Sequence, residues 1–334
     1  MSTTRQTKGV LLEKRLIENR QLVGILTMFM IVQFAGIALA TLWFNGATYQ
    51  QITSSQVATG PTNAIFLIGY IIILAAVMIL IFRFYHGAKL FRVIEGVVIF
   101  IASFYVFLIL LAYATQNTNI ATAGAVIMAI LLVAAKNKWV KLKNVAAIIA
   151  SIGVGAVLGV GFSFLAAIIF MGLLAIYDFV AVFITKHMIT LANVVTENNL
   201  AFMVDMSEVE GVPKSNFSKK EFAEYNKELK ASGSRGRRIM SVMKKSSGMG
   251  LVPISANVAL GTGDLAIPLM VAVSAYKLTL SFVPSFFIAF GAVLGLLLTM
   301  FILRKYKRAL PAIPPLFLGV LIGFALYYLI YYVV

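Results

Sequence analysis

The chain has 334 residues, of which 61% are hydrophobic and only 12% charged, and its formal net charge is +16. This composition excludes an ordinary soluble globular protein and is typical of a polytopic membrane protein. The chain has no cysteine, which excludes disulfide frameworks, thiolate metal sites and cysteine nucleophiles, and its only histidines are His86 and His187. A histidine-rich metal site or a serine–histidine hydrolase is therefore poorly supported.

Long apolar windows recur along the chain, and a membrane-spanning helix needs about 20 such residues. A polar tail covers residues 1–21 and precedes the first window. The predicted spans are 22–44, 62–82, 93–113, 120–135, 144–160, 163–185, 253–275, 284–303 and 311–333. The predicted fold class is therefore an all-α polytopic membrane protein with nine transmembrane helices.

The basic residues predict the orientation of these helices, because positively charged loops stay in the cytoplasm. With a cytoplasmic N-terminus, every lysine and arginine falls in a cytoplasmic segment except Lys277. An odd number of spans then places the C-terminus outside. The net charge follows from this topology, with some attraction to anionic lipid, so binding of nucleic acid is not expected.

Four segments follow from these assignments: a cytoplasmic tail (1–21), transmembrane helices one to six (22–189), a cytoplasmic loop (190–250) and helices seven to nine (251–334). The loop has alternating charge and few large apolar groups, so we expect much of it to be mobile. In the fifth span, Gly155 and Gly159 have the spacing that lets two helices approach closely.

Two aspartates, Asp178 and Asp264, lie well inside apolar runs, whereas Glu95 lies at the edge of a run. An aspartate at the centre of a membrane helix costs roughly 2.5–3.5 kcal/mol on insertion scales, so two of them indicate a function. Both lie roughly 10–16 Å from the predicted inner boundary at the rise of an α-helix. Two antiparallel neighbouring helices could therefore bring them face to face.

A pair of carboxylates in a low-dielectric site does not ionise fully, so one holds a proton while the other stays charged. Such a pair can activate a water with one group and protonate a carbonyl or leaving nitrogen with the other. This chemistry requires no metal and no cofactor. It does require a water-filled opening to the cytoplasm.

Two further elements accompany the aspartates. Gly261, Thr262 and Gly263 directly precede Asp264, and glycines there allow close backbone approach and loosen the helix. The last span opens with Leu310-Pro311-Ala312-Ile313-Pro314-Pro315. Its prolines remove backbone donors, which predicts free carbonyls near the inner boundary. The alternative is an ordinary helix N-terminus with prolines in its first turn.

Taken in order, Tyr177-Asp178, Gly261-Thr262-Gly263-Asp264 and Leu310-Pro311-Ala312-Ile313 resemble the motifs of the presenilin and signal peptide peptidase family of intramembrane aspartyl proteases. The nine-span plan with a long loop after span six is similar to that family over nearly the whole chain. The chain most resembles a microbial, archaeal-type presenilin homologue, which implies the cell membrane of a microbe.

The resemblance implies that Asp178 and Asp264 are the catalytic pair and that Tyr177, Gly261, Thr262 and Gly263 shape the site. It also implies that Leu310, Pro311, Ala312 and Ile313 support the site and contact substrate. The family's motif has leucine where this chain has the β-branched Ile313. The expected partners are the lipid bilayer and the transmembrane helices of substrate proteins, and a homo-oligomer is left open.

Substrate helices must unwind before cleavage, and an extended segment could add as a strand to an edge near the site. We expect this edge at the end of span six, the start of span seven and residues 309–315. The main alternative function is an ion or proton-coupled transporter, because buried carboxylates often mark ion routes. A prepilin-type peptidase fits less well, because the span count is high and the proline-rich segment has no counterpart there.

Overall fold

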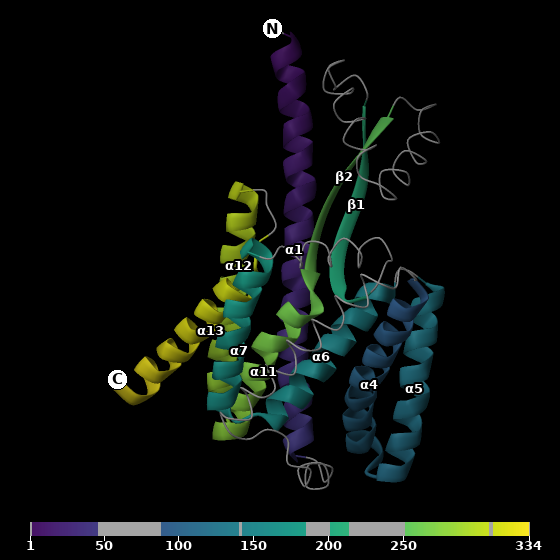
Figure 1. Cartoon of the computed structure of the whole chain (residues 1–334), viewed down its shortest axis with the longest axis vertical. Coiled ribbons are helices and arrows are strands. Elements are labelled where there is room, and N and C mark those ends of the chain that lie inside the picture. The colour runs from purple at the N-terminus through teal and green to yellow at the C-terminus, as the bar shows by residue number, and fades with distance from the viewer. Residues whose placement is uncertain are drawn as a thin grey trace. The chain divides into compact units, whose positions relative to one another are not determined.

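The computed structural model describes residues 2–45, 88–139, 142–184, 201–213, 251–306 and 310–333. Within these ranges the chain forms long helices and a two-stranded sheet (Figure 1). It divides into two units, residues 1–27 with 205–259 and residues 28–204 with 260–334. The first unit contains the beginning of the first helix and most of the two strands. The second contains the rest of the helices.

The described helices agree with the predicted spans at most positions. They are α1 (Ser2–Asn45), α4 (Ala88–Thr115), α5 (Thr118–Lys138), α6 (Lys143–Gly161), α7 (Phe164–Phe179), α11 (Thr262–Thr279), α12 (Phe282–Tyr306) and α13 (Ile313–Tyr328). Short π-helical segments, Val180–Ile184 and Leu329–Val333, extend α7 and α13. Within the described residues, seven helices are long and apolar enough to cross a membrane, and α11 is not among them. The predicted span 62–82 lies outside the described residues, so the count of nine stays a prediction.

The segment before the seventh span differs from its prediction. Residues Leu251–Gly261 form strand β2, which pairs with strand β1 (Met203–Pro213), and α11 begins only at Thr262. A helix that begins at residue 253 was therefore wrong, whereas the all-α membrane class stands, with this two-stranded sheet added to it. Pro253 disfavours helical geometry at Val252, and the β-branched Ile254 and Val258 follow it in the strand. Strand β1 also lies within the segment 190–250, which we expected to be largely mobile.

Helix α11 lies at the centre of the helical unit, where it contacts α6, α7, α12 and α13. Nearly every residue from Leu265 to Tyr276 is buried. Because protein surrounds this helix, it can carry polar groups that a lipid-facing helix would expose to hydrocarbon. One of them is Lys277, whose Nζ donates a hydrogen bond of 2.7 Å to the Val160 carbonyl near the end of α6. A lysine in that position satisfies a carbonyl that the end of α6 leaves free.

Glycines bring α6 directly against α11. A Cβ at Gly155 would lie 2.8 Å from the Ala266 carbonyl oxygen, and a Cβ at Gly159 would lie 2.5 Å from the Cβ of Val273. No larger residue fits at either position without moving α11. The predicted close approach at Gly155 and Gly159 is therefore confirmed, and its partner is the helix that carries Asp264.

Helices α12 and α13 are in backbone contact through four glycines (Figure 1). Gly291 and Gly295 on α12 face Gly319, Gly323 and Pro315 on α13. A Cβ at Gly291 would lie 2.1 Å from the Gly319 carbonyl oxygen. This packing fixes the position of the N-terminal turn of α13, which is part of the site described next.

Candidate active site

Asp178 occupies the last turn of α7 and is only 6% exposed. Its carboxylate caps the N-terminus of α13: Oδ2 accepts a hydrogen bond from the Ile313 backbone N–H at 3.2 Å, and the Ala312 N–H also donates to the carboxylate. A negative charge at the N-terminus of a helix is stabilised by the helix dipole. The buried acid on α7 is thus held by the helix that begins the predicted ninth span.

The sequence of the first turn of α13 explains why these two N–H groups face Asp178. A helix leaves its first four N–H groups without partners inside the helix. With Ala312 as N-cap, two of the four positions are Pro314 and Pro315, which have no N–H. Only the N–H groups of Ala312 and Ile313 remain, and Asp178 accepts both.

The sequence predicted free carbonyls in the proline-rich segment, and at Ala312 that prediction was wrong. The Ala312 carbonyl accepts the Leu316 N–H at 3.3 Å. What the segment provides to Asp178 is a pair of backbone donors. The alternative interpretation, a helix N-terminus with prolines in its first turn, is confirmed, and the donors that the prolines leave are used by the site.

Asp264 lies in the first turn of α11, three residues after the N-cap Gly261. Its carboxylate interacts with the backbone N–H of Gly261, the N-cap residue of the same helix. A Cβ at Gly261 would lie 3.1 Å from Asp264 Oδ2, so a larger residue would press on this carboxylate. Asp264 is half-buried and lies at the positive end of the dipole of its own helix, whereas Asp178, at the end of α7, lies at the positive end of the dipole of α13.

The two aspartates lie on helices that pack against each other. Helices α7 and α11 are in contact, and the carboxylates of Asp178 and Asp264 interact electrostatically. The side chain of Tyr177 is half-buried and also interacts electrostatically with Asp178. Two acids that meet can share one proton, and a water between them would have a base on one side and an acid on the other.

Thr262 is the most firmly held residue of the Gly261–Asp264 motif. Its N–H and its Oγ1 both donate to the Phe202 carbonyl, at 3.0 Å and 3.1 Å. Its own carbonyl accepts a hydrogen bond of 3.3 Å from Ser151 Oγ on α6. These bonds fix the backbone two residues before Asp264.

Replacing Thr262 with valine should lower the turnover of the protease about five- to ten-fold without unfolding it. Valine keeps the size and β-branching of threonine but loses the Oγ1 bond to Phe202, which is worth about 1 kcal/mol. Thr262→Ser keeps the hydroxyl and should retain most of the activity. Measured kcat values for both variants check this, and equal losses in Val and Ser variants would contradict it.

Some residues that hold the site were not singled out from the sequence. Gln33 on α1 is fully buried and donates from Nε2 to the Leu265 carbonyl at 3.0 Å, and Ser151 and Phe202 hold Thr262. A signal existed for two of them, because Gln33 and Ser151 are polar residues inside apolar runs. Phe202 acts through its carbonyl, which side-chain chemistry does not reveal.

The other predicted site residues lie directly before Ile313 or directly before Asp264 in the chain. Pro311 is buried and Leu310 half-buried, directly before the capped turn of α13. Gly263 is exposed, with no heavy atom nearer than Ile267 Cδ1 at 4.0 Å to the position of a Cβ. Among the described residues, no three His, Cys, Asp or Glu side chains gather as a metal site would require.

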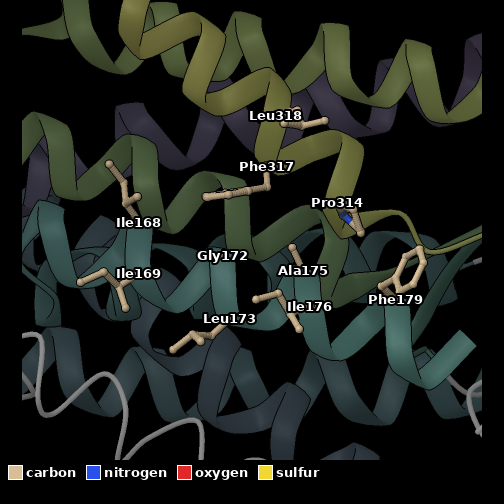
Figure 2. Close-up of a pocket in the computed structure, with 10 residues that line it drawn as sticks. All are labelled: Ile168, Ile169, Gly172, Leu173, Ala175, Ile176, Phe179, Pro314, Phe317 and Leu318. Carbon is tan, nitrogen blue, oxygen red and sulfur yellow. The ribbon is translucent and has the colours of Figure 1, made fainter. Parts of the chain in front are cut away.

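An apolar groove of about 640 Å³ lies between α7 and α13 (Figure 2). Its lining residues are all apolar: Ile168, Ile169, Gly172, Leu173, Ala175, Ile176, Phe179, Pro314, Phe317 and Leu318. Ile176 is 64% exposed although it lies on a membrane-spanning helix. The groove therefore opens toward the lipid within one or two residues of the acid.

A membrane helix bundle that carries one aspartate on each of two packed helices is the arrangement expected of an intramembrane aspartyl protease. Comparison with known proteins supports the same class. Residues 26–333 match the family described as "Signal-peptide peptidase, presenilin aspartyl protease". The chain belongs to this family and is an intramembrane aspartyl protease. The transporter and prepilin-type alternatives are set aside by this result.

Two solved structures of a presenilin family intramembrane aspartate protease, in C222 and P2 space groups, have a similar fold. They superpose with TM-scores of 0.59 and 0.57 at 21% sequence identity. The matches cover 92% of this chain and 99% and 97% of those chains. No curated protein matches the chain.

Proposed function

We propose that Asp178 and Asp264 are the catalytic pair of this protease and that they cleave peptide bonds within transmembrane segments of other proteins. The observation that carries the proposal is the meeting of the two carboxylates at the N-terminal ends of two helices. No other acidic residue was found well inside an apolar run of the sequence.

The mechanism follows from one proton shared by two acids. The charged carboxylate removes a proton from a water, whose oxygen attacks the carbonyl carbon of the substrate. The protonated carboxyl gives its proton to the carbonyl oxygen, which forms a tetrahedral diol. Return of protons through the same two groups then protonates the leaving nitrogen as the carbon–nitrogen bond breaks. The pair ends in the state in which it began.

The residues around the pair have supporting roles in this proposal. Tyr177 lies beside the acid on α7, and Gly261, Thr262 and Gly263 leave the approach to Asp264 free of bulky side chains. Leu310 to Ile313 bring the capping N–H groups to Asp178. The backbone at Gly261 is extended, with φ −63° and ψ 143°, which supports pairing with an unwound substrate strand at the start of α11.

The apolar groove is the proposed contact for the substrate's hydrophobic side chains, because it opens toward lipid and its lining includes Phe179, the residue after Asp178. Replacing Leu173 in the groove with tryptophan should raise KM about five- to ten-fold and change kcat little. Leu165→Trp is the matched control, since Leu165 is an exposed leucine of the same helix and does not line the groove. Equal KM values for the two variants would remove the groove from the substrate path.

The finer topology is also part of the proposal. We propose nine spans with a cytoplasmic N-terminus in the cell membrane of a microbe, supported by the placement of all basic residues except Lys277. The water that reacts would then enter from the cytoplasmic side.

The proposal is tested with purified protein in lipid bilayers and a synthetic peptide that has one transmembrane segment of about 20 residues. Two glycines at the centre of this segment lower its helix propensity and ease unwinding. Mass spectrometry should find two products whose masses show that a peptide bond within the segment was cut. A peptide that stays intact, or is cut only outside the segment, would contradict the proposal.

A further inference from the structure

A buried ion pair lies away from the two aspartates, between α4 and α5. Glu95 on α4 is 0% exposed and Lys136 on α5 is 8% exposed, and Lys136 Nζ contacts Glu95 Oε1. The two helices lie side by side in Figure 1. Burying two charges costs several kcal/mol of desolvation per ion, so a pair of this kind adds little net stability on its own.

Glu95 has a second partner, which the ion pair alone does not explain. The same Oε1 accepts a hydrogen bond from the backbone N–H of Ala201, a residue that is itself buried. Ala201 comes two residues before strand β1 begins at Met203. The contact with Lys136 holds this oxygen in place, so the pair forms a fixed acceptor for one backbone group.

The next residue connects this acceptor to the active site. The carbonyl of Phe202 accepts both the N–H and the Oγ1 of Thr262, and Thr262 lies two residues before Asp264. Adjacent Cα atoms are separated by a fixed 3.8 Å. Fixing the Ala201 N–H on Glu95 therefore restricts where the Phe202 carbonyl can lie.

We propose that Glu95, held by Lys136, is a positioning residue for catalysis: it anchors residues 201 and 202 so that Phe202 holds Thr262, and with it Asp264, in register with Asp178. The proposal rests on the catalytic role of the two aspartates. It assigns to α4 and α5, which carry no catalytic residue, a share in the geometry of the site.

Two double variants separate this role from simple charge balance. Glu95→Met with Lys136→Met removes both charges and the acceptor, whereas Glu95→Gln with Lys136→Met removes both charges and keeps an oxygen for Ala201. Replacing a buried ion pair with apolar residues of similar size is often neutral for stability, so both variants should fold. We expect the Met/Met variant to lose at least ten-fold in kcat at nearly unchanged KM, and the Gln/Met variant to stay within about two-fold of wild type.

Hydrogen–deuterium exchange gives a readout that does not depend on activity. The Thr262 amide should exchange faster in the Met/Met variant than in wild type, while the Gln/Met variant should protect it. Wild-type kcat with unchanged protection in the Met/Met variant would overturn the proposal, and so would equal kcat losses in both double variants. If wild-type protein cleaves no peptide, the catalytic assignment fails, whereas the exchange result still decides whether Glu95 anchors Thr262.

A second pair of variants applies if the Met/Met protein does not fold. Ala201→Pro removes the N–H that Glu95 accepts, and Ala201→Gly keeps it. The proline variant should lose kcat and Thr262 protection and the glycine variant should lose neither. Full activity of the proline variant would overturn the proposal.

Discussion

Replacing Asp264 with asparagine should reduce peptide cleavage at least about 1,000-fold while the protein stays folded. General acid–base catalysis by a positioned group contributes typically 10²–10⁴-fold, and an amide can neither accept the proton of water nor return one. The amide oxygen of asparagine can still accept the Gly261 N–H, so the first turn of α11 should persist. Asp178→Asn should have the same effect, because its oxygen can still accept from Ala312 and Ile313.

The measurement is the initial cleavage rate of the single-span peptide, with thermal unfolding in detergent as the test of folding. Asp205→Asn is the matched control, since it makes the same chemical change in the predicted cytoplasmic loop and should leave the rate near that of wild type. A variant of either aspartate that keeps more than about a tenth of wild-type turnover would rule out a two-aspartate mechanism.

The second large effect is expected at the contact of α12 with α13. Replacing Gly291 with alanine would place a Cβ 2.1 Å from the Gly319 carbonyl oxygen and 3.0 Å from the Gly323 Cα. Both neighbours are backbone, so no side chain can turn away and the helices must separate. Overpacking of this kind costs typically 1–3 kcal/mol, and the backbone contact places the expected loss near about 3 kcal/mol.

Gly96→Ala on α4 is the control for this substitution. A Cβ there would meet only Val133 Cγ1 at 3.6 Å, an ordinary contact. Alanine also has a better helix propensity than glycine, by about 1 kcal/mol. Thermal unfolding should therefore show a lower Tm for Gly291→Ala and an unchanged or higher Tm for Gly96→Ala. Similar Tm values for the two variants would show that α12 and α13 are not in backbone contact.

The aspartate pair could be predicted because a carboxylate inside an apolar run is rare and its depth can be calculated from the helix rise. In the structure the two residues lie on helices α7 and α11, which pack against each other, and the charge of Asp178 acts on Asp264. The close approach at Gly155 and Gly159 could be predicted for the same kind of reason, since spacing on one helix face is visible in the sequence.

The start of the seventh span could not be predicted by hydropathy, because a buried strand and a membrane helix are both apolar. Most of residues 251–261 are apolar, as the end of a membrane helix would be. Only Pro253 and the β-branched residues indicate the strand. The bonds of Phe202, Ala312 and Ile313 are made by backbone groups, whose partners depend on the tertiary fold. Sequence patterns of side chains do not contain that information.

The paired prolines of α13 have a consequence for how the membrane can act on this enzyme. They leave two donors for the carboxylate on α7, and the glycine contacts hold the backbones of α12 and α13 directly against each other. If α12 and α13 tilt together to match a thinner or thicker bilayer, the N–H groups of Ala312 and Ile313 would move away from Asp178. Lipid chain length would then change turnover by lengthening or restoring the two hydrogen bonds between α13 and Asp178.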